Sequence, residues 1–214
     1  MIFNNREHAG ELLARRLIRY KGKNPLVLGI PRGAVPMAKI IADALAGDLD
    51  VVLVRKLGYP GQPELAIGAI DESGNTFLAD YAADVEVAYL EAEKKEQAEV
   101  IRRRRALYTP ARPPLDPHNR IVIVVDDGIA TGATMVTALR AIRAKNPQKL
   151  IAAVAVASSQ AARSIARECD TLVCLDVPAE FYAVGQFFRD FSQVSDEDVV
   201  ETLRRSETRI SAAV

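Results

Sequence analysis

The sequence predicts an α/β protein built on an open parallel sheet that is flanked by helices. Short runs of β-branched and apolar residues, such as Val122–Val125, alternate along the chain with amphipathic stretches at helical spacing, such as Ala34–Leu45. This alternation is typical of parallel sheets, in which a helix connects one strand to the next and both faces become covered. A chain of 214 residues is also long enough to bury one sizeable core.

The first half of the chain contains the first two predicted strands and their helices. An amphipathic helix over Asn5–Tyr20 comes first, because leucines and isoleucine gather on one of its sides. The remaining elements follow in the same α/β order, and they end with a loop and a hairpin: strand Leu26–Ile30, helix Ala34–Leu45, strand Val51–Val54, a glycine- and proline-rich loop over Leu57–Ala66, and a hairpin that joins Ile67–Ile70 to Thr76–Leu78.

The second half begins with a long polar helix and a proline-rich linker, and then returns to the α/β pattern. Continuous apolar runs in this half indicate strands that are buried on both faces. The predicted elements are helix Glu86–Leu107, linker Pro110–Pro117, strand Val122–Val125, helix Met135–Ala144, strand Leu150–Val156, helix Gln160–Arg167, strand Thr171–Leu175 and helix Asp196–Arg205.

Composition limits the function classes. Lys and Arg together number 28, and so do Asp and Glu, so no global field favours nucleic acid or an anionic membrane. We expect no nucleic-acid partner and no membrane span, since no apolar run approaches ~20 residues. Only two cysteines are present and the N-terminus lacks a signal-peptide pattern, so the sequence predicts a cytoplasmic protein.

Residues 122–134, Val-Ile-Val-Val-Asp-Asp-Gly-Ile-Ala-Thr-Gly-Ala-Thr, are the most informative stretch of the chain. Two adjacent carboxylates follow an apolar strand, and a turn of small residues then leads into a helix. The carboxyl edge of an open α/β sheet is where ligands bind, and the turn offers backbone N–H groups and hydroxyls to a phosphate. Each carboxylate can accept from a sugar hydroxyl, so the stretch predicts a site for ribose 5-phosphate.

This stretch resembles the phosphoribosyl pyrophosphate (PRPP) signature of type I phosphoribosyltransferases: an apolar strand, two acids, three residues, then Thr-Gly-x-Thr. The resemblance implies that the type I phosphoribosyltransferase fold is present. We also expect a small C-terminal hood and an inserted helical arm, and the resemblance explains neither the arm nor the C-terminal tail. It does imply that Asp126 and Asp127 bind the ribose hydroxyls. The loop that binds the 5′-phosphate is then Ala130, Thr131, Gly132, Ala133 and Thr134.

A second turn at a strand-to-helix edge is Gly29-Ile30-Pro31-Arg32-Gly33-Ala34. Arg32 supplies a planar fork of donors and Gly33 allows close backbone approach, which suits a diphosphate. In the family this place holds the pyrophosphate loop, so the resemblance implies that Pro31, Arg32 and Gly33 form it, with a cis peptide between Pro31 and Arg32. The alternative is a tight turn with a surface arginine.

Arg55 and Lys56 end the predicted second strand, and the loop after them has the composition of a mobile lid. We expect both cations to face the same crevice, with Lys56 contacting the diphosphate as similar residues do in several phosphoribosyltransferases. A solvated loop with surface cations is the alternative.

Aromatic residues concentrate between Phe181 and Phe191, and a flat ring near the crevice can stack on a nucleobase. The segment resembles the base-recognition segment of hypoxanthine-guanine phosphoribosyltransferases, which implies that Phe181 and Tyr182 stack on the acceptor. Two departures disfavour a 6-oxopurine: Ala130 stands where those enzymes carry an Asp, and Glu180 replaces a basic residue. A hydrophobic cap that serves stability alone is the alternative.

The sequence therefore predicts one phosphoribosyltransferase-like domain over residues 1–214. Its core covers about residues 21–79 and 119–176, an inserted helical arm covers 80–118, and a hood covers 177–214 together with the N-terminal segment. The arm includes Glu91–Arg105, where acids precede bases. It is interpreted as a solvated insertion, or else its arginines Arg102–Arg105 contact a partner subunit or an anion.

The predicted activity is transfer of the 5-phosphoribosyl group from PRPP to a nitrogenous, aromatic acceptor in nucleotide salvage, with release of pyrophosphate. The predicted catalytic groups are Arg32, Lys56, Asp126 and Asp127. Mg²⁺ is the expected cofactor, bound mainly by PRPP oxygens, with Asp126 and Asp127 reaching it through water. A homodimer is left open. The main alternative is a non-catalytic PRPP or nucleotide sensor, and a phosphorylase or hydrolase using the same pocket is a more distant one.

Overall fold

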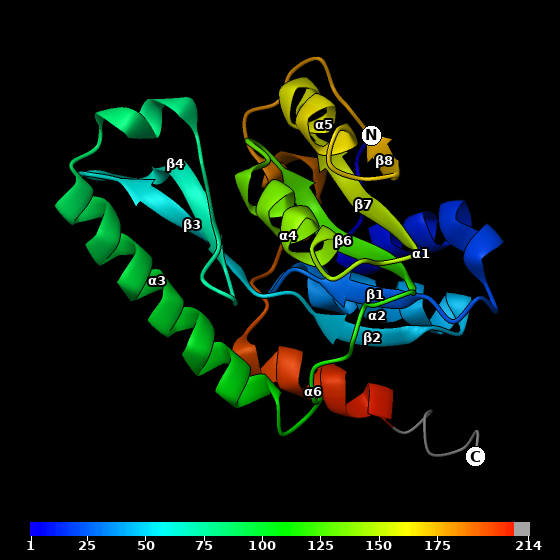
Figure 1. Ribbon diagram of the computed structural model, residues 1–214. Helices are drawn as coiled ribbons and strands as arrows, with labels where there is room; N and C mark the ends of the chain where they lie inside the picture. Colours follow the sequence, from blue (N-terminus) through cyan, green and yellow to red (C-terminus); the bar gives the residue numbers. More distant parts are fainter. Residues whose placement is uncertain (208–214) are drawn as a thin grey trace.

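The computed structural model describes residues 1–207, except for the side chains of residues 63, 64, 80, 81 and 207. Its centre is a five-stranded, all-parallel sheet with the strand order β2-β1-β6-β7-β8 (Figure 1). The predicted open parallel sheet is thus confirmed. Its strands are β1 (Leu26–Gly29), β2 (Asp48–Val51), β6 (Ile121–Ile129), β7 (Lys149–Ala157) and β8 (Thr171–Asp176).

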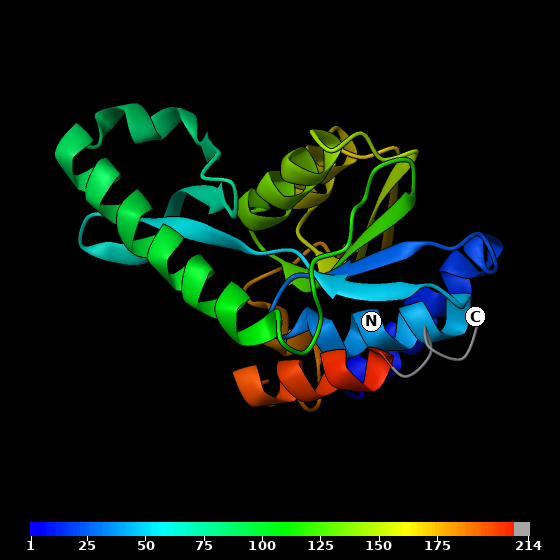
Figure 2. The same cartoon turned by 60° about the horizontal axis from the view of Figure 1, so that its bottom comes forward.

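Helices cover both faces of this sheet, as Figure 2 shows most clearly. Alternate strand residues point to opposite sides, so Val27, Ile123 and Ile151 pack toward one pair of helices and Leu26 and Val122 toward the other. The first pair is α1 (Arg6–Leu17), extended by a 3₁₀ turn (Ile18–Tyr20), and α2 (Ala34–Leu45); the second pair is α4 (Ala133–Arg143) and α5 (Ser159–Ala166).

The antiparallel sheet beside the core corrects two expectations. Residues Val51–Val54 do not form one strand: β2 ends at Val51, and β3 begins at Val54 in a different sheet. The segment Leu57–Ala66 is not a loop, because it belongs to β3 and β4, which pair antiparallel around a tight turn at Pro60–Gly61. Backbone pairing across a two-residue turn overrides the loop-like composition. The strands are β3 (Val54–Tyr59), β4 (Gln62–Asp71) and β5 (Thr76–Leu78), and the predicted hairpin between β4 and β5 is confirmed.

The long polar helix is confirmed as α3 (Val87–Tyr108), which follows a 3₁₀ turn (Asp80–Asp84). It runs along β3 and β4, and its C-terminal end reaches the last helix, α6 (Asp196–Glu207) (Figure 1). The predicted arm is therefore packed on the molecule along its length, and it brings its arginines back toward the core.

The N-terminal segment and the segment after β8 pack together. Phe3 is fully buried, donates its backbone N–H to the carbonyl of Phe187, and stacks at 5.2 Å between ring centroids on Phe188. A 3₁₀ turn (Val184–Phe187) lies in this region. The predicted hood extends to residue 214, and its part over residues 208–214 lies outside the described residues. No helix in residues 1–207 is long and apolar enough to cross a bilayer.

Truncation of Phe3 should loosen the hood. Phe3→Ala is expected to lower the free energy of unfolding by about 3–5 kcal/mol, since it removes a fully buried aromatic side chain. Ile2→Ala is the matched control because Ile2 is exposed, and it should change stability by less than about 0.5 kcal/mol. Urea titrations measure both values, and equal losses in the two variants would contradict the packing.

Candidate functional site

The acidic pair lies near the end of β6. The strand continues through both carboxylates to Ile129, so Asp126 and Asp127 are its late residues rather than part of a following turn, which corrects the expected boundary. Both side chains are half-buried, and the backbone N–H of Asp127 donates to Oδ1 of Asp126 at 2.9 Å. Only the side-chain atoms that remain accessible to solvent can therefore reach a ligand.

Arg6 of α1 is the partner of the acidic pair. Its Nε donates to Oδ2 of Asp127 at 2.7 Å, its Nη1 donates to the carbonyl of Ser192 at 2.6 Å, and its guanidinium lies 3.9 Å from the ring centre of Phe191. Sequence reasoning missed Arg6, since 121 positions separate it from Asp127. No local signal distinguishes it from other surface arginines of an amphipathic helix.

Burial and mutual repulsion disfavour two charges at the acidic pair. Burial raises the pKa of Asp126 well above its usual value, and the charge of Asp127 raises it further. Burial also raises the pKa of Asp127, although the Arg6 guanidinium opposes that shift. A ligand that brings donors or a cation to this pair would relieve the repulsion.

The loop after β1 meets the acidic pair directly. β1 and β6 pair in parallel with Gly29 opposite Val125, so the chain segments that follow lie side by side. Gly33 approaches so closely that an added Cβ would collide with Oδ2 of Asp127. The peptide bond between Pro31 and Arg32 is cis, as the resemblance implied. The nearby Asp127 carboxylate thus gives a steric reason for a glycine at position 33, and the sequence of the turn did not reveal this neighbour.

Arg32 points toward α6. Its Nη1 lies 3.7 Å from Oδ2 of Asp196, the first residue of that helix. Arg104 of α3 and the hydroxyl of Tyr108 contact the other oxygen of the same carboxylate. Sequence reasoning singled out the arginine run of the arm but not its meeting with Asp196, which depends on how α3 and α6 pack.

The predicted 5′-phosphate loop forms the N-terminus of α4. Gly132 has a φ of +92°, a conformation that side chains disfavour, and it caps the helix. The first N–H groups of a helix have no acceptor within the helix. In the described part of the chain, the backbone N–H groups of Ala133 and Thr134 donate to no backbone carbonyl outside the helix. The hydroxyl of Ser158 donates to the carbonyl of Ala130 at 2.7 Å and fixes the other side of the loop. Thr131 is exposed.

Arg55 and Lys56 belong to β3, outside the parallel sheet. The Nε of Arg55 donates to Oε1 of Gln97 on α3 at 2.9 Å. Burial lowers the pKa of Arg55, the charges of Arg104 and Arg32 lower it further, and the charge of Glu93 opposes these shifts. Arg55 therefore joins the surroundings of Arg32. Lys56 is the next residue of the same strand, so its side chain leaves the opposite face of β3. The expectation that both cations face the same crevice is therefore wrong, because side chains alternate along a strand.

The aromatic segment after β8 lies partly over the acidic pair. Phe181 is half-buried and stacks on Phe187 at 5.3 Å between ring centroids, while Tyr182 is exposed. Val184 packs so tightly against Gly128 that an added Cβ there would collide with it. The two predicted stacking residues thus have different surroundings, and only Tyr182 has most of its ring open to solvent.

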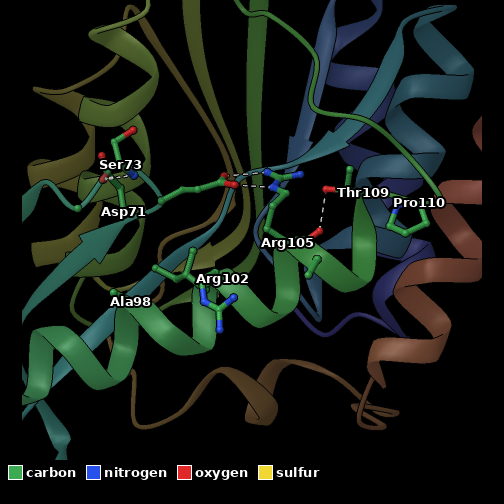
Figure 3. Close-up of a pocket in the computed structure, with 11 residues that line it drawn as sticks. Asp71, Ser73, Ala98, Arg102, Arg105, Thr109 and Pro110 are labelled. Carbon is green, nitrogen blue, oxygen red and sulfur yellow. Dashed lines mark hydrogen bonds and ion pairs between the residues drawn. The ribbon is translucent and has the colours of Figure 1, made fainter.

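A cavity of about 740 Å³ lies elsewhere, between α3 and the turn that joins β4 to β5. Arg105 lines this cavity (Figure 3) and pairs with Glu72, with an Nε–Oε1 distance of 2.5 Å. None of the predicted PRPP-binding residues lines it. A smaller cavity of about 400 Å³ includes Ala130–Ala133 of the predicted phosphate loop and the side chain of Arg140. Size alone therefore does not identify the candidate site.

The fold and the grouped residues together define a class of protein. A parallel sheet carries an acidic pair at the end of one strand, a glycine-capped helix N-terminus after it, and an arginine turn beside it. This is the arrangement of type I phosphoribosyltransferases that the motifs implied.

Comparison with known proteins shows the family. The chain belongs to the phosphoribosyl transferase domain family, whose model matches residues 1–187. Two curated Mycobacterium tuberculosis proteins, from strains CDC 1551 and H37Rv, are each 42% identical over 208 residues, covering 96% of this chain and 47% of their own length. Both carry a provisional name as phosphoribosyl transferases. The chain thus spans about half the length of the curated relatives it matches.

Solved structures support the same fold. TT1426 from Thermus thermophilus is 43% identical, covers 96% of this chain and 99% of its own, and superposes with a TM-score of 0.83. The AQ2163 protein from Aquifex aeolicus is 11% identical, covers 80% of this chain and 74% of its own, and superposes with a TM-score of 0.51. The second similarity shows the fold alone.

Removing one buried charge should stabilise the protein. The folded pKa of Asp126 is raised, so the folded state keeps a proton that the unfolded chain has already lost, and stability falls as pH rises from about 4 through that folded pKa. Asp126→Asn should therefore raise the free energy of unfolding at pH 7 by roughly 1–3 kcal/mol. The gain should shrink as the pH falls toward about 4, because the folded state then carries less of the charge of Asp126.

Urea titrations at several pH values measure this gain. Asp84→Asn is the matched control because Asp84 is exposed, and it should change stability by less than about 0.5 kcal/mol. A loss of stability in Asp126→Asn at pH 7 would show that the charge of Asp126 is satisfied within the folded chain.

Proposed function

We propose that this protein transfers the 5-phosphoribosyl group of PRPP to a nitrogenous acceptor and releases pyrophosphate. The observation that supports this most strongly is the direct contact of Gly33 with Asp127. It brings the arginine turn and the acidic pair together, so a ribose whose hydroxyls face the acids has its anomeric carbon near Arg32. Family membership supports the same class of reaction.

In this proposal the N–H groups at the start of α4 bind the 5′-phosphate, with the hydroxyls of Thr131 and Thr134 beside them. Asp126 and Asp127 accept from the ribose hydroxyls. Arg32, with Arg55, binds the diphosphate, whereas Lys56 leaves the opposite face of β3 and is not part of this group. As the bond from the anomeric carbon to the diphosphate oxygen breaks, positive charge develops on the sugar, and the bond to the acceptor nitrogen forms. Electrostatic stabilisation and positioning then supply most of the catalysis.

Mg²⁺ fits this site as an ion carried mainly by the ligand. No cluster of three or more metal-binding side chains is found among the described residues, and the carboxylates of Asp126 and Asp127 are the acids in the candidate site. Their raised pKa values show that a nearby positive charge would be favourable there. Mg²⁺ would neutralise diphosphate charge, and the two acids would reach it through water.

We propose an aromatic acceptor other than hypoxanthine or guanine. Ala130 offers no carboxylate, and residues 156–159 include no cation. The hydroxyl of Ser158 donates to the carbonyl of Ala130 and so anchors the loop. The backbone carbonyl of Glu180 accepts from Gln186, so this hydrogen bond does not use the Glu180 side chain. That side chain is exposed, and Tyr182 is two residues further along the chain. An acceptor with a hydrogen-bond donor suits this environment.

A PRPP or nucleotide sensor is the second candidate, and one observation favours it. The segment expected to close over the ligand as a mobile lid is a paired β-hairpin, β3–β4. A sensor requires no water-excluding closure, whereas a transferase does. Release of pyrophosphate distinguishes the two functions.

Neutralising the acidic pair should abolish PRPP binding. Asp126→Asn with Asp127→Asn is expected to weaken PRPP at least about 100-fold, because two charged acceptors for ribose hydroxyls are lost. The matched control is Asp84→Asn with Asp116→Asn, since both side chains are exposed. Calorimetry in the presence of Mg²⁺ measures affinity, and unchanged binding in the folded double variant refutes the assignment.

Turnover with a panel of acceptors tests the function itself. The wild-type protein is incubated with PRPP, Mg²⁺ and one of hypoxanthine, guanine, adenine, uracil, orotate or nicotinate, and pyrophosphate release is measured. We expect turnover with an acceptor other than hypoxanthine or guanine, since a site that pairs a polar group rejects analogues lacking it by up to ~10⁴-fold. A best rate with hypoxanthine or guanine contradicts the specificity. Tight PRPP binding without turnover favours the sensor.

A further inference from the structure

The Asp196 carboxylate lies where three separate parts of the chain meet. Its Oδ2 is 3.7 Å from Nη1 of Arg32, and its Oδ1 is 3.6 Å from Nε of Arg104. The hydroxyl of Tyr108, a fully buried residue, donates to the same Oδ1. All three charged side chains remain partly exposed, with 20–29% of each side chain accessible. A ligand can therefore reach the group.

Positive charge exceeds what this single carboxylate neutralises. Arg55 adds a third guanidinium, and the charges of Arg104 and Arg32 both lower its pKa. Glu93 is the acid that opposes this shift. Three arginines thus face two carboxylates, of which Asp196 alone lies between Arg32 and Arg104. A polyanion would satisfy this group better than a carboxylate does.

Arg104 differs from its neighbours in the arginine run. Arg102 and Arg103 are about three-quarters exposed and pair with Glu99 on their own helix. Arg105 pairs with Glu72 at the turn between β4 and β5. Only Arg104 of these four lies at the carboxylate that also holds Arg32, so the arm delivers one specific cation to the pyrophosphate loop.

We propose that Arg104 binds the diphosphate of the ligand together with Arg32, and that Asp196 occupies this position until the diphosphate displaces it. The inference rests on the proposed function, because it takes the Arg32 turn as the diphosphate site. It gives the inserted arm a direct part in substrate binding, and it makes the start of α6 a competitor for the same guanidiniums.

Calorimetry with two probes tests the proposal. Pyrophosphate reports on the arginines, and ribose 5-phosphate reports on the acidic pair and the α4 loop. Arg104→Gln should weaken pyrophosphate binding about tenfold or more, equivalent to about 1.4 kcal/mol, while leaving ribose 5-phosphate unchanged. Arg104→Lys, which keeps the charge, should restore part of the affinity. Arg103→Gln is the matched control on the same helix and should bind both probes as the wild type does.

The Asp196→Asn variant tests displacement. Because it removes the competing charge but keeps a similar shape, it should bind pyrophosphate more tightly than the wild type. Thermal unfolding of each variant identifies any that fail to fold, and Arg104→Lys then provides the comparison for Arg104. Weaker pyrophosphate binding by folded Asp196→Asn would overturn the competition between Asp196 and the ligand.

Other outcomes separate this inference from the proposed function. Unchanged pyrophosphate affinity in Arg104→Gln overturns the inference, even if the wild type turns over PRPP. Failure of the wild type to bind pyrophosphate overturns it as well. Pyrophosphate binding that depends on Arg104 supports the inference, even if no acceptor is phosphoribosylated and the transferase function fails.

Discussion

The parallel pairing of β1 with β6 is the constraint on which the candidate site depends. Gly29 lies opposite Val125, so the chain leaves both strands at the same edge. The turn after β1 then lies against the acidic residues of β6, and a Cβ at position 33 would displace the carboxylate of Asp127. A shift of this register by one residue would turn every side chain of the strand to the other face and separate the two groups.

Electrostatics at this edge is unfavourable in the isolated chain. Two neighbouring acids are partly buried with one guanidinium, that of Arg6, against one of them. Arg32 and Arg104, from distant parts of the chain, meet at Asp196, and the charges of both act on Arg55. Separated acidic and basic groups of this kind complement a ligand that carries donors at one end and a multiply charged anion at the other. The buried acidic pair thus lowers the stability of the folded chain, as expected of a group that serves the proposed ligand rather than the fold.

The arm and the last helix complete this edge from outside the sheet. α3 carries Arg104 and Tyr108 to Asp196, and α3 also contacts β3, where Arg55 donates to Gln97. An insertion that was interpretable as a solvated helix is therefore packed against the predicted diphosphate site. The same helix forms one wall of the cavity of about 740 Å³, which lies away from the motif residues.

Local pattern was enough to predict much of the fold. Helix Ala34–Leu45 was predicted with its observed bounds, and four of the five strands of the parallel sheet were found because continuous apolar runs have few alternatives to a buried strand. The exception is β2, which was expected at Val51–Val54 and lies at Asp48–Val51. The hairpin at Leu57–Ala66 was not predicted, because its glycines and prolines favour a loop. Only the pairing of β3 with β4 stabilises it as strands.

The candidate site shows the same contrast between residues that local sequence indicates and contacts that only packing sets. The sequence by itself determined the residues that lie close along the chain, namely Asp126, Asp127, the loop Ala130–Thr134 and the turn at Arg32, because local motifs carry their own geometry. Only the tertiary structure decided that Arg6 pairs with Asp127 and that Arg104 meets Arg32 at Asp196. These contacts join residues that lie far apart along the chain, and packing of helices on the sheet sets them, which no local spacing encodes.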